Sequence, residues 1–157
     1  MARVITGAPV TSTLMGLGAF PASSDQWLGM LGMHGTYEAN YAMNQADLIV
    51  ALGTLLDDIT TQGYRFPRWP QPQQALVHVY PDHAVVGQHF GAQWPIVADP
   101  IDIMSQLIDC EPGVLQTAER KAWQQALLET FGCDEFQGFL RGRSMPATEA
   151  SRLLHVH

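Results

Sequence analysis

Two glycine-rich segments of this chain have the composition of ligand-binding loops. Leu31-Gly-Met-His-Gly-Thr36 directly precedes a helical pattern, and Gly16-x-Gly18 follows a short β-branched run. Unpaired backbone N–H groups at a helix N-terminus suit a phosphate or the polar edge of a ring, and glycine lets such a ligand come close. An ordinary structural turn explains either segment equally well. Gly16-x-Gly18 also lacks the third glycine of a dinucleotide fingerprint.

The titratable residues offer little chemistry of their own. Asp57 and Asp58 could form an acid–base pair, but adjacent residues usually point apart, so no catalytic dyad is expected. Cys110 and Cys133 are isolated, which is typical of reduced thiols in a cytoplasmic protein. We predict no metal site, because the six histidines form no HxxxH pair and no cluster with cysteine: His34, His78, His83, His89, His155 and His157. Only His34 lies inside a motif, where it is expected to orient the loop.

The elements that must position these residues alternate between strand and helix. The apolar run 47–53 predicts a strand buried on both faces of a parallel sheet. Helices are predicted over 36–46, capped by Thr36, from Pro100 onward behind an Asp99 cap, and over 115–131. Strands are expected near 9–14, 47–53, 76–80 and 95–98, with loops at 15–24 and 67–72. The alternation predicts an α/β three-layer sandwich with a mainly parallel, doubly wound, Rossmann-like sheet, which binds ligands at its strand ends.

Composition excludes several classes of protein. The net charge of −7, with only eight scattered Lys and Arg residues, argues against a nucleic-acid partner. No apolar run reaches the roughly 20 residues of a membrane span, and no signal peptide is visible. Charged residues make up 15% of the chain, fewer than the roughly 25% usual for soluble domains. This low fraction suggests that part of the surface is normally covered, as in a homo-oligomer.

The segments TLMGLGAFP and LGMLGMHGT, followed by a strand ending in G-x-x-x-DD, resemble the central domain of acetolactate synthase and related thiamine-diphosphate-dependent enzymes. The resemblance covers roughly residues 6–154 and is strongest through Asp58. In flavin-containing members these loops lie along FAD. The resemblance, together with an acid expected near a ribose, therefore assigns cofactor binding to Thr13, Leu14, Met15, Leu31, Gly32, Met33, His34, Gly35, Thr36, Gly53, Asp57 and Asp82. It assigns no catalytic residue to this chain.

Two departures from the family pattern concern the flavin. The family has Gly-x-Arg-Phe-Asp-Asp-Arg where this chain has Leu55 and Ile59 at the arginine positions. The family strand HIDIDPAEIG aligns without gaps and puts Tyr80 at the first acid, leaving Asp82 at the second. The resemblance therefore implies FAD as a cofactor, whereas the lost cations predict weak binding.

The resemblance also implies parts that this sequence lacks. Family enzymes need an N-terminal domain that supplies a glutamate, and a GDG…N segment that holds Mg²⁺ and thiamine diphosphate; neither occurs here. We expect residues 1–140 to be a central domain truncated at its N-terminal strand, and 141–157 to be a linker and the start of the C-terminal domain. The implied parent is a carboligase or decarboxylase of 2-keto acids, with this fragment inactive and binding neither thiamine diphosphate nor Mg²⁺.

Two other functions remain open from the sequence. A self-contained Rossmann oxidoreductase would require the G-x-G-x-x-G fingerprint, which is absent. A stand-alone nucleotide-binding or regulatory module without catalysis would instead oligomerise through its exposed apolar face.

Overall fold

A computed structural model of the 157-residue chain describes residues 7–109, 122, 135–136 and 145–146. The predicted helix over 115–131 lies outside these residues except for Ala122. The predicted boundary at 140/141 and the segment 141–157 also lie outside them, except for Met145 and Pro146.

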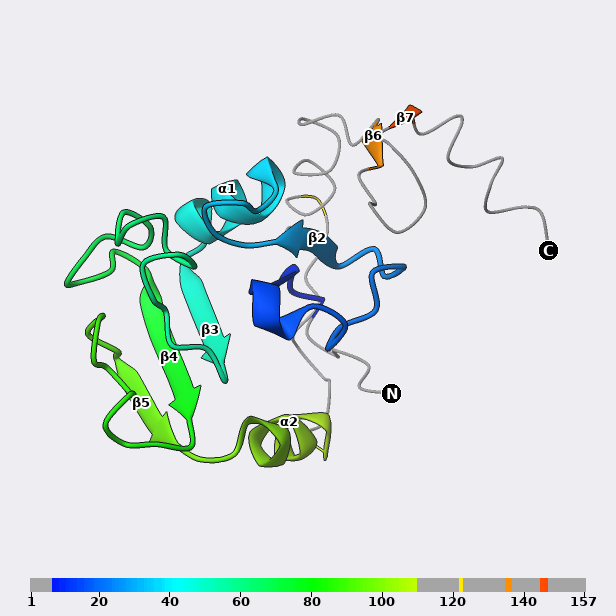
Figure 1. Ribbon diagram of the computed structural model, residues 1–157. Coiled ribbons are helices and arrows are strands. Elements are labelled where there is room, and N and C mark those ends of the chain that lie inside the picture. The colour runs from blue at the N-terminus through cyan, green and yellow to red at the C-terminus, as the bar shows by residue number, and fades with distance from the viewer. Residues whose placement is uncertain (1–6, 110–121, 123–134, 137–144, 147–157) are drawn as a thin grey trace.

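The larger sheet has three parallel strands, β3 (Leu48–Leu52), β4 (Ala75–Tyr80) and β5 (Trp94–Val97), in the order β3-β4-β5. Leu48 pairs with Ala75, and Val77 pairs with Trp94. These strands coincide closely with the apolar runs expected at 47–53, 76–80 and 95–98. The prediction of an α/β fold with parallel strands is confirmed (Figure 1).

A separate parallel pair is formed by β1 (Val10–Ser12) and β2 (Trp27–Met30), and the short 3-10 helix η1 (Leu14–Gly16) follows β1. The sequence predicted β1 but assigned no strand to residues 27–30, where β2 lies. Gly29 obscured β2 because it interrupts the strand pattern. Its φ of +98° and the Thr36 side chain, 2.6 Å from where a Cβ would lie, explain why glycine is needed there.

Both predicted helices within the described residues are present. Helix α1 (Tyr37–Gln45) begins at Thr36, whose hydroxyl accepts a 3.3 Å hydrogen bond from Ala39 N and donates a 2.7 Å bond to Leu28 O. Helix α2 (Pro100–Asp109) begins after Asp99, whose carboxylate accepts a 2.7 Å bond from Ile101 N. A two-residue antiparallel pair joins β6 (Glu135–Phe136) to β7 (Met145–Pro146).

The expectation that the 47–53 strand is buried on both faces is wrong for the described residues. Ala51 is 5% exposed, packed with Leu56 and Phe90, whereas Leu48 and Val50 on the opposite face are 46% and 49% exposed. Parallel strands are buried on both faces only when a second layer covers them. Among the described elements, β3 pairs only with β4 and β1 only with β2, so the sheet is short and split.

Candidate functional site

The loop at residues 31–36 is held in place by Asn40, a residue that the sequence analysis missed. Gly32 N donates to Asn40 Oδ1 at 3.0 Å, and Asn40 Nδ2 donates to Gly32 O at 3.0 Å and to Thr36 O at 2.9 Å. His34, which was expected to orient the loop, is exposed and makes none of these bonds. The available signal was an amide side chain one helical turn after the Thr36 cap, within reach of the loop backbone.

The glycines of this loop are required by the chain's own packing. A Cβ on Gly32 would lie 2.5 Å from Ile59 O, and a Cβ on Gly35 would collide with Met30 O. Met33 N donates to the same Ile59 carbonyl at 2.9 Å, so the loop docks on the segment that follows β3. The close backbone approach that glycine permits is therefore already used by the protein itself.

Few donors in the 31–36 loop remain for an anion. Five of its six backbone N–H groups already donate within the chain: Leu31 to Ser12 O, Gly32 to Asn40 Oδ1, Met33 to Ile59 O, Gly35 to Gly32 O and Thr36 to Met30 O. Anion binding at a helix N-terminus depends on such donors being unpaired. The loop is therefore a turn whose backbone donors are mostly satisfied within the chain, and it offers few N–H groups to a phosphate.

The acids after β3 also stabilise their own turn. Asp57 Oδ1 accepts a 2.8 Å hydrogen bond from Thr60 N, and Asp58 Oδ1 accepts a 2.9 Å bond from Ile59 N. These bonds are typical of acids that cap turns. Neither bond links the two carboxylates, so their arrangement gives no support to a shared-proton pair.

His78 on β4 is the second residue whose structural role the sequence did not predict. It is 2% exposed, and its Nδ1 accepts a 3.2 Å hydrogen bond from Gly87 N while its Nε2 lies 2.9 Å from Thr54 O. Because a backbone N–H can only donate, Nδ1 is the acceptor and Nε2 carries the proton that is donated to Thr54 O. The neutral imidazole thus joins the loop after β3 to the loop after β4.

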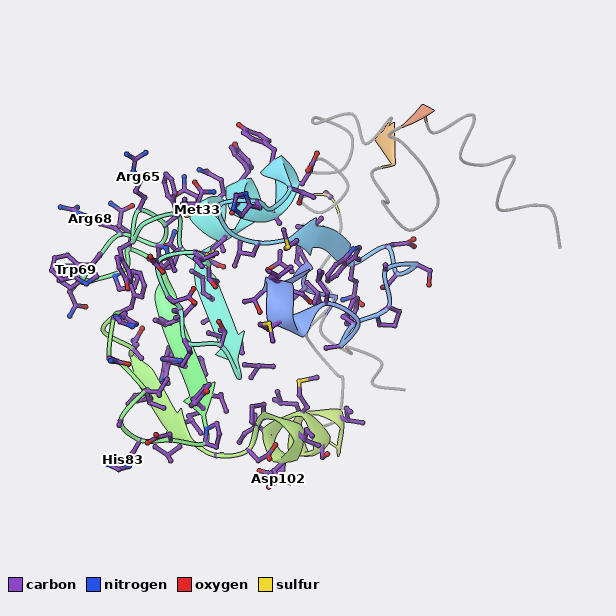
Figure 2. All side chains as sticks on the ribbon, viewed as in Figure 1. Met33, Arg65, Arg68, Trp69, His83 and Asp102 are labelled. Carbon is purple, nitrogen blue, oxygen red and sulfur yellow. The ribbon has the colours of Figure 1, made fainter. Side chains whose placement is uncertain are left out.

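The predicted cofactor-binding residues fall into two groups. Residues 31–36 contact Ile59, and Leu31 N also bonds Ser12 O, next to Thr13, while Leu14 and Met15 are exposed on η1. Asp82 lies on the other loop, where it accepts a 2.9 Å bond from Ala84 N and is 3.6 Å from His83 Nδ1. Met33 lies beside α1 near the start of β3, whereas His83 lies beyond the end of β4 (Figure 2). The structure thus joins the glycine loop to the residues after β3 and leaves Asp82 apart.

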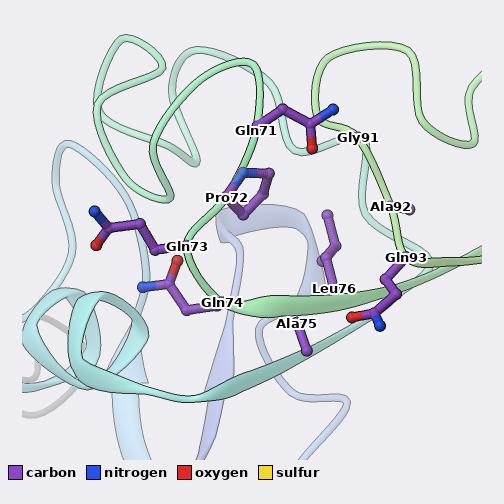
Figure 3. Close-up of a pocket in the computed structure, with 9 residues that line it drawn as sticks. All are labelled: Gln71, Pro72, Gln73, Gln74, Ala75, Leu76, Gly91, Ala92 and Gln93. Carbon is purple, nitrogen blue, oxygen red and sulfur yellow. The ribbon is translucent and has the colours of Figure 1, made fainter.

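A cavity of about 390 Å³ opens at the start of β4, the edge opposite the strand ends where ligands were expected (Figure 3). It is lined by four glutamines and small or apolar residues: Gln71, Pro72, Gln73, Gln74, Ala75, Leu76, Gly91, Ala92 and Gln93. Gln74 Nε2 donates to Asn44 O at 2.8 Å, while its buried Oε1 has no hydrogen-bond partner. The lining carries no charged side chain.

Two kinds of feature are absent from the described part of the chain: a cluster of metal ligands and a membrane-crossing helix. Within those residues, no group of three or more His, Cys, Asp or Glu side chains is arranged to hold a metal ion. None of the described helices combines the length and the apolar character that crossing a bilayer demands.

Parallel strands flanked by helices define an α/β domain of Rossmann-like type. The model of the thiamine pyrophosphate enzyme central domain matches residues 5–107, and the chain belongs to this family. It is 44% identical over 101 residues to the acetolactate synthase isozyme 3 large subunit of Escherichia coli K12, covering 64% of this chain and 17% of that protein. It is 36% identical over 121 residues to the acetolactate synthase large subunit of Haemophilus influenzae, covering 76% and 21%.

A third relative is the acetolactate synthase of Mycobacterium avium, 38% identical over 133 residues, with 81% of this chain and 21% of the relative covered. The chain thus spans about a fifth of the length of the curated relatives it matches.

The described residues fit a flavin diphosphate poorly. Leu55 and Ile59, which stand where the family pattern has arginine, are exposed apolar side chains. The only Lys or Arg residues among the described ones are Arg65 and Arg68, farther along the same loop. A diphosphate here would therefore gain no cation at the two family positions, and five of the six N–H groups of the 31–36 loop are already engaged.

Proposed function

We propose that this chain is the central, non-catalytic domain of an acetolactate synthase-like enzyme that joins or decarboxylates 2-keto acids. The observation that carries the proposal is the family match over residues 5–107, together with acetolactate synthases that are 36% identical over 121 residues and 44% identical over 101 residues. In such an enzyme, thiamine diphosphate with Mg²⁺ supplies the carbanion chemistry when bound. The partners are then the remaining domains of the enzyme and further copies of the chain, in the cytoplasm.

The chain's own contribution is to hold a fixed shape between those domains. Asn40, Asp57 and His78 each use their polar side chains to tie loops to the backbone. A side chain that is engaged in this way stabilises the fold and is not positioned to exchange a proton with a substrate. These engaged side chains support the proposal that the isolated chain is catalytically inactive.

The main alternative is a stand-alone nucleotide-binding or regulatory module without catalysis. Calorimetry of the purified chain with thiamine diphosphate and Mg²⁺, combined with an assay of pyruvate turnover, tests the first proposal. We expect no heat of binding and no turnover. Micromolar binding or acetolactate formation would contradict it. Flanking coding sequence that supplies a glutamate-bearing domain before this chain and a GDG…N segment after it would exclude the alternative.

FAD binding is expected to be too weak to survive purification, so the protein should be colourless. Losing two charge-assisted hydrogen bonds, at about 1.5–3 kcal/mol each, weakens an affinity by several orders of magnitude. Leu55→Arg alone should not restore binding, because five of the six N–H groups of the 31–36 loop stay engaged within the chain. Absorbance near the flavin bands, measured before and after incubation with FAD, checks this; a yellow preparation would contradict it.

A further inference from the structure

The loop at residues 63–70, Gly-Tyr-Arg-Phe-Pro-Arg-Trp-Pro, is firmly anchored although it connects two strands over the protein surface. At its start, the fully buried Thr61 accepts bonds on its carbonyl oxygen from Arg65 N at 3.0 Å and from Phe66 N at 3.1 Å. The Thr61 hydroxyl accepts from Tyr64 N and donates to Asp57 O. At the other end, Pro70 O accepts a 2.9 Å bond from Gly91 N. We call residues 63–70 the arginine loop.

Packing fixes the arginine loop further. The Tyr64 ring lies 5.2 Å from the His89 ring and 6.1 Å from the ring of the buried Phe90, and Pro67 is fully buried. Tyr64 and the preceding Gln62 both have a left-handed backbone, with φ of +61° and +53°, which non-glycine residues seldom adopt. Such conformations persist where the surroundings over-determine them, and they are frequent at binding loops.

The anchored loop presents two cations and an indole to solvent. Arg65, Arg68 and Trp69 project outward from the same end of the molecule (Figure 2), and Trp69 is 58% exposed. Neither guanidinium forms an ion pair or a side-chain hydrogen bond within the described part of the chain. These two arginines are also the only Lys or Arg in that part, in a protein whose net charge is −7. The surface is thus a local basic site on an acidic protein.

The glutamine-lined cavity begins where the arginine loop ends, because Pro70 is followed directly by Gln71. Gln71 lies at the rim of the cavity (Figure 3). Side-chain carboxamides both donate and accept hydrogen bonds, as a peptide backbone does. Gln74 Oε1 is buried from solvent, so the exposed Gln71, Gln73 and Gln93 present the carboxamides on this surface.

We propose that Arg65, Arg68 and Trp69, with the adjoining glutamine-lined cavity, bind an extended acidic segment of another protein. The guanidinium groups match carboxylates in geometry and charge, and Arg and Trp are the residues most often responsible for interface affinity. The carboxamides match the main chain of the segment. The two cations of the arginine loop, the only Lys or Arg among the described residues, are too few for a nucleic-acid groove, which needs a continuous basic surface.

The test uses a fluorescein-labelled octaglutamate peptide and the full chain, followed by fluorescence anisotropy at low salt. We expect saturable binding that falls by at least about tenfold in the variant Arg65→Gln/Arg68→Gln. The matched control, Arg141→Gln/Arg143→Gln, changes the net charge by the same amount and should bind as the unmodified chain does. Trp69→Ala should weaken binding several-fold, and thermal melting should show that each variant stays folded.

Competing partners are distinguished in the same assay. No saturable binding, or an equal loss in both double variants, would overturn the proposal because the interaction would then be absent or unspecific. Tighter binding of a single-stranded oligonucleotide with the same charge would assign the surface to nucleic acid instead. Full competition by millimolar inorganic phosphate would also overturn the proposal, because the surface would then be a general anion site. The result does not depend on the proposed role in a thiamine-diphosphate enzyme, since no cofactor or activity is measured.

Discussion

At the scale of single residues, polar side chains of this protein act mainly on its own backbone. Asn40 fastens the glycine loop to α1, and His78 joins the loops after β3 and β4. Both residues are therefore structural in the described chain, and their removal should affect loop order before anything else.

Asn40→Ala should destabilise the chain by about 1–3 kcal/mol, because it removes three hydrogen bonds and leaves both backbone groups of Gly32 without these partners. Urea denaturation measures the loss in free energy of unfolding. Hydrogen exchange at Gly32 N measures how far the loop loses its protection. His34→Ala is the control, since the exposed His34 makes none of these bonds. Equal stability of both variants would show that the Asn40 clamp contributes nothing.

His78→Phe should destabilise by about 1–3 kcal/mol or more, because Thr54 O and Gly87 N lose their partner and a larger ring must fit the same buried site. Nitrogen NMR of the unmodified protein should show a neutral imidazole with its proton on Nε2. The exposed His83 provides the control variant, His83→Phe, which should change stability little. A proton found on Nδ1 would contradict the assigned hydrogen bonds.

At the scale of elements, the turn from β2 into α1 is determined by contacts between segments. Gly29, Gly32 and Gly35 each lie where a Cβ would meet another part of the chain. The conformation is thus set by the approach of Met30, Thr36 and the Ile59 carbonyl. A glycine pattern shows in the sequence that something approaches the backbone closely. It does not show whether that neighbour is a ligand or another segment of the chain.

Gly35→Ala should be strongly disruptive, because its Cβ would collide with the Met30 carbonyl and backbone must shift. Overpacking of this kind costs about 1–3 kcal/mol or more. Gly16→Ala is the matched control: its nearest neighbour would be the Thr13 hydroxyl at 3.4 Å, an ordinary contact. Thermal unfolding followed by circular dichroism compares them. A Gly35→Ala protein as stable as Gly16→Ala would show that the loop can relax.

At the scale of the whole molecule, β1 to β5 form two separate parallel sheets, and no further described strand extends either of them. β3 and β1 each have one strand partner among the described elements, and the Leu48 and Val50 side chains are half-exposed on one face of β3. Unpaired edges and exposed apolar faces promote association. Apolar exposure of this kind matches the low charged fraction of the sequence.

The purified chain should self-associate through β3, and Val50→Lys should shift it toward monomer because a charge is placed on that face. Analytical ultracentrifugation over a concentration series gives the association constant. Val97→Lys, at a comparably exposed valine on β5, adds the same charge and should leave association unchanged. A monodisperse monomer at high concentration would contradict the prediction, and an equal effect of both lysines would place the contact elsewhere.

The sequence by itself determined the family, the parallel strands β3, β4 and β5, and the starts of both described helices. These features follow from local patterns: continuous apolar runs, a Thr36 cap, and Asp99 with Pro100. Only the tertiary structure decided that β2 is a strand, that one face of β3 is exposed, and that Asn40 and His78 tie the loops. Each of these depends on which distant backbone groups come within hydrogen-bonding or contact distance. The spacing of residues along the chain does not encode that distance, because the distance is set by how the segments pack against one another.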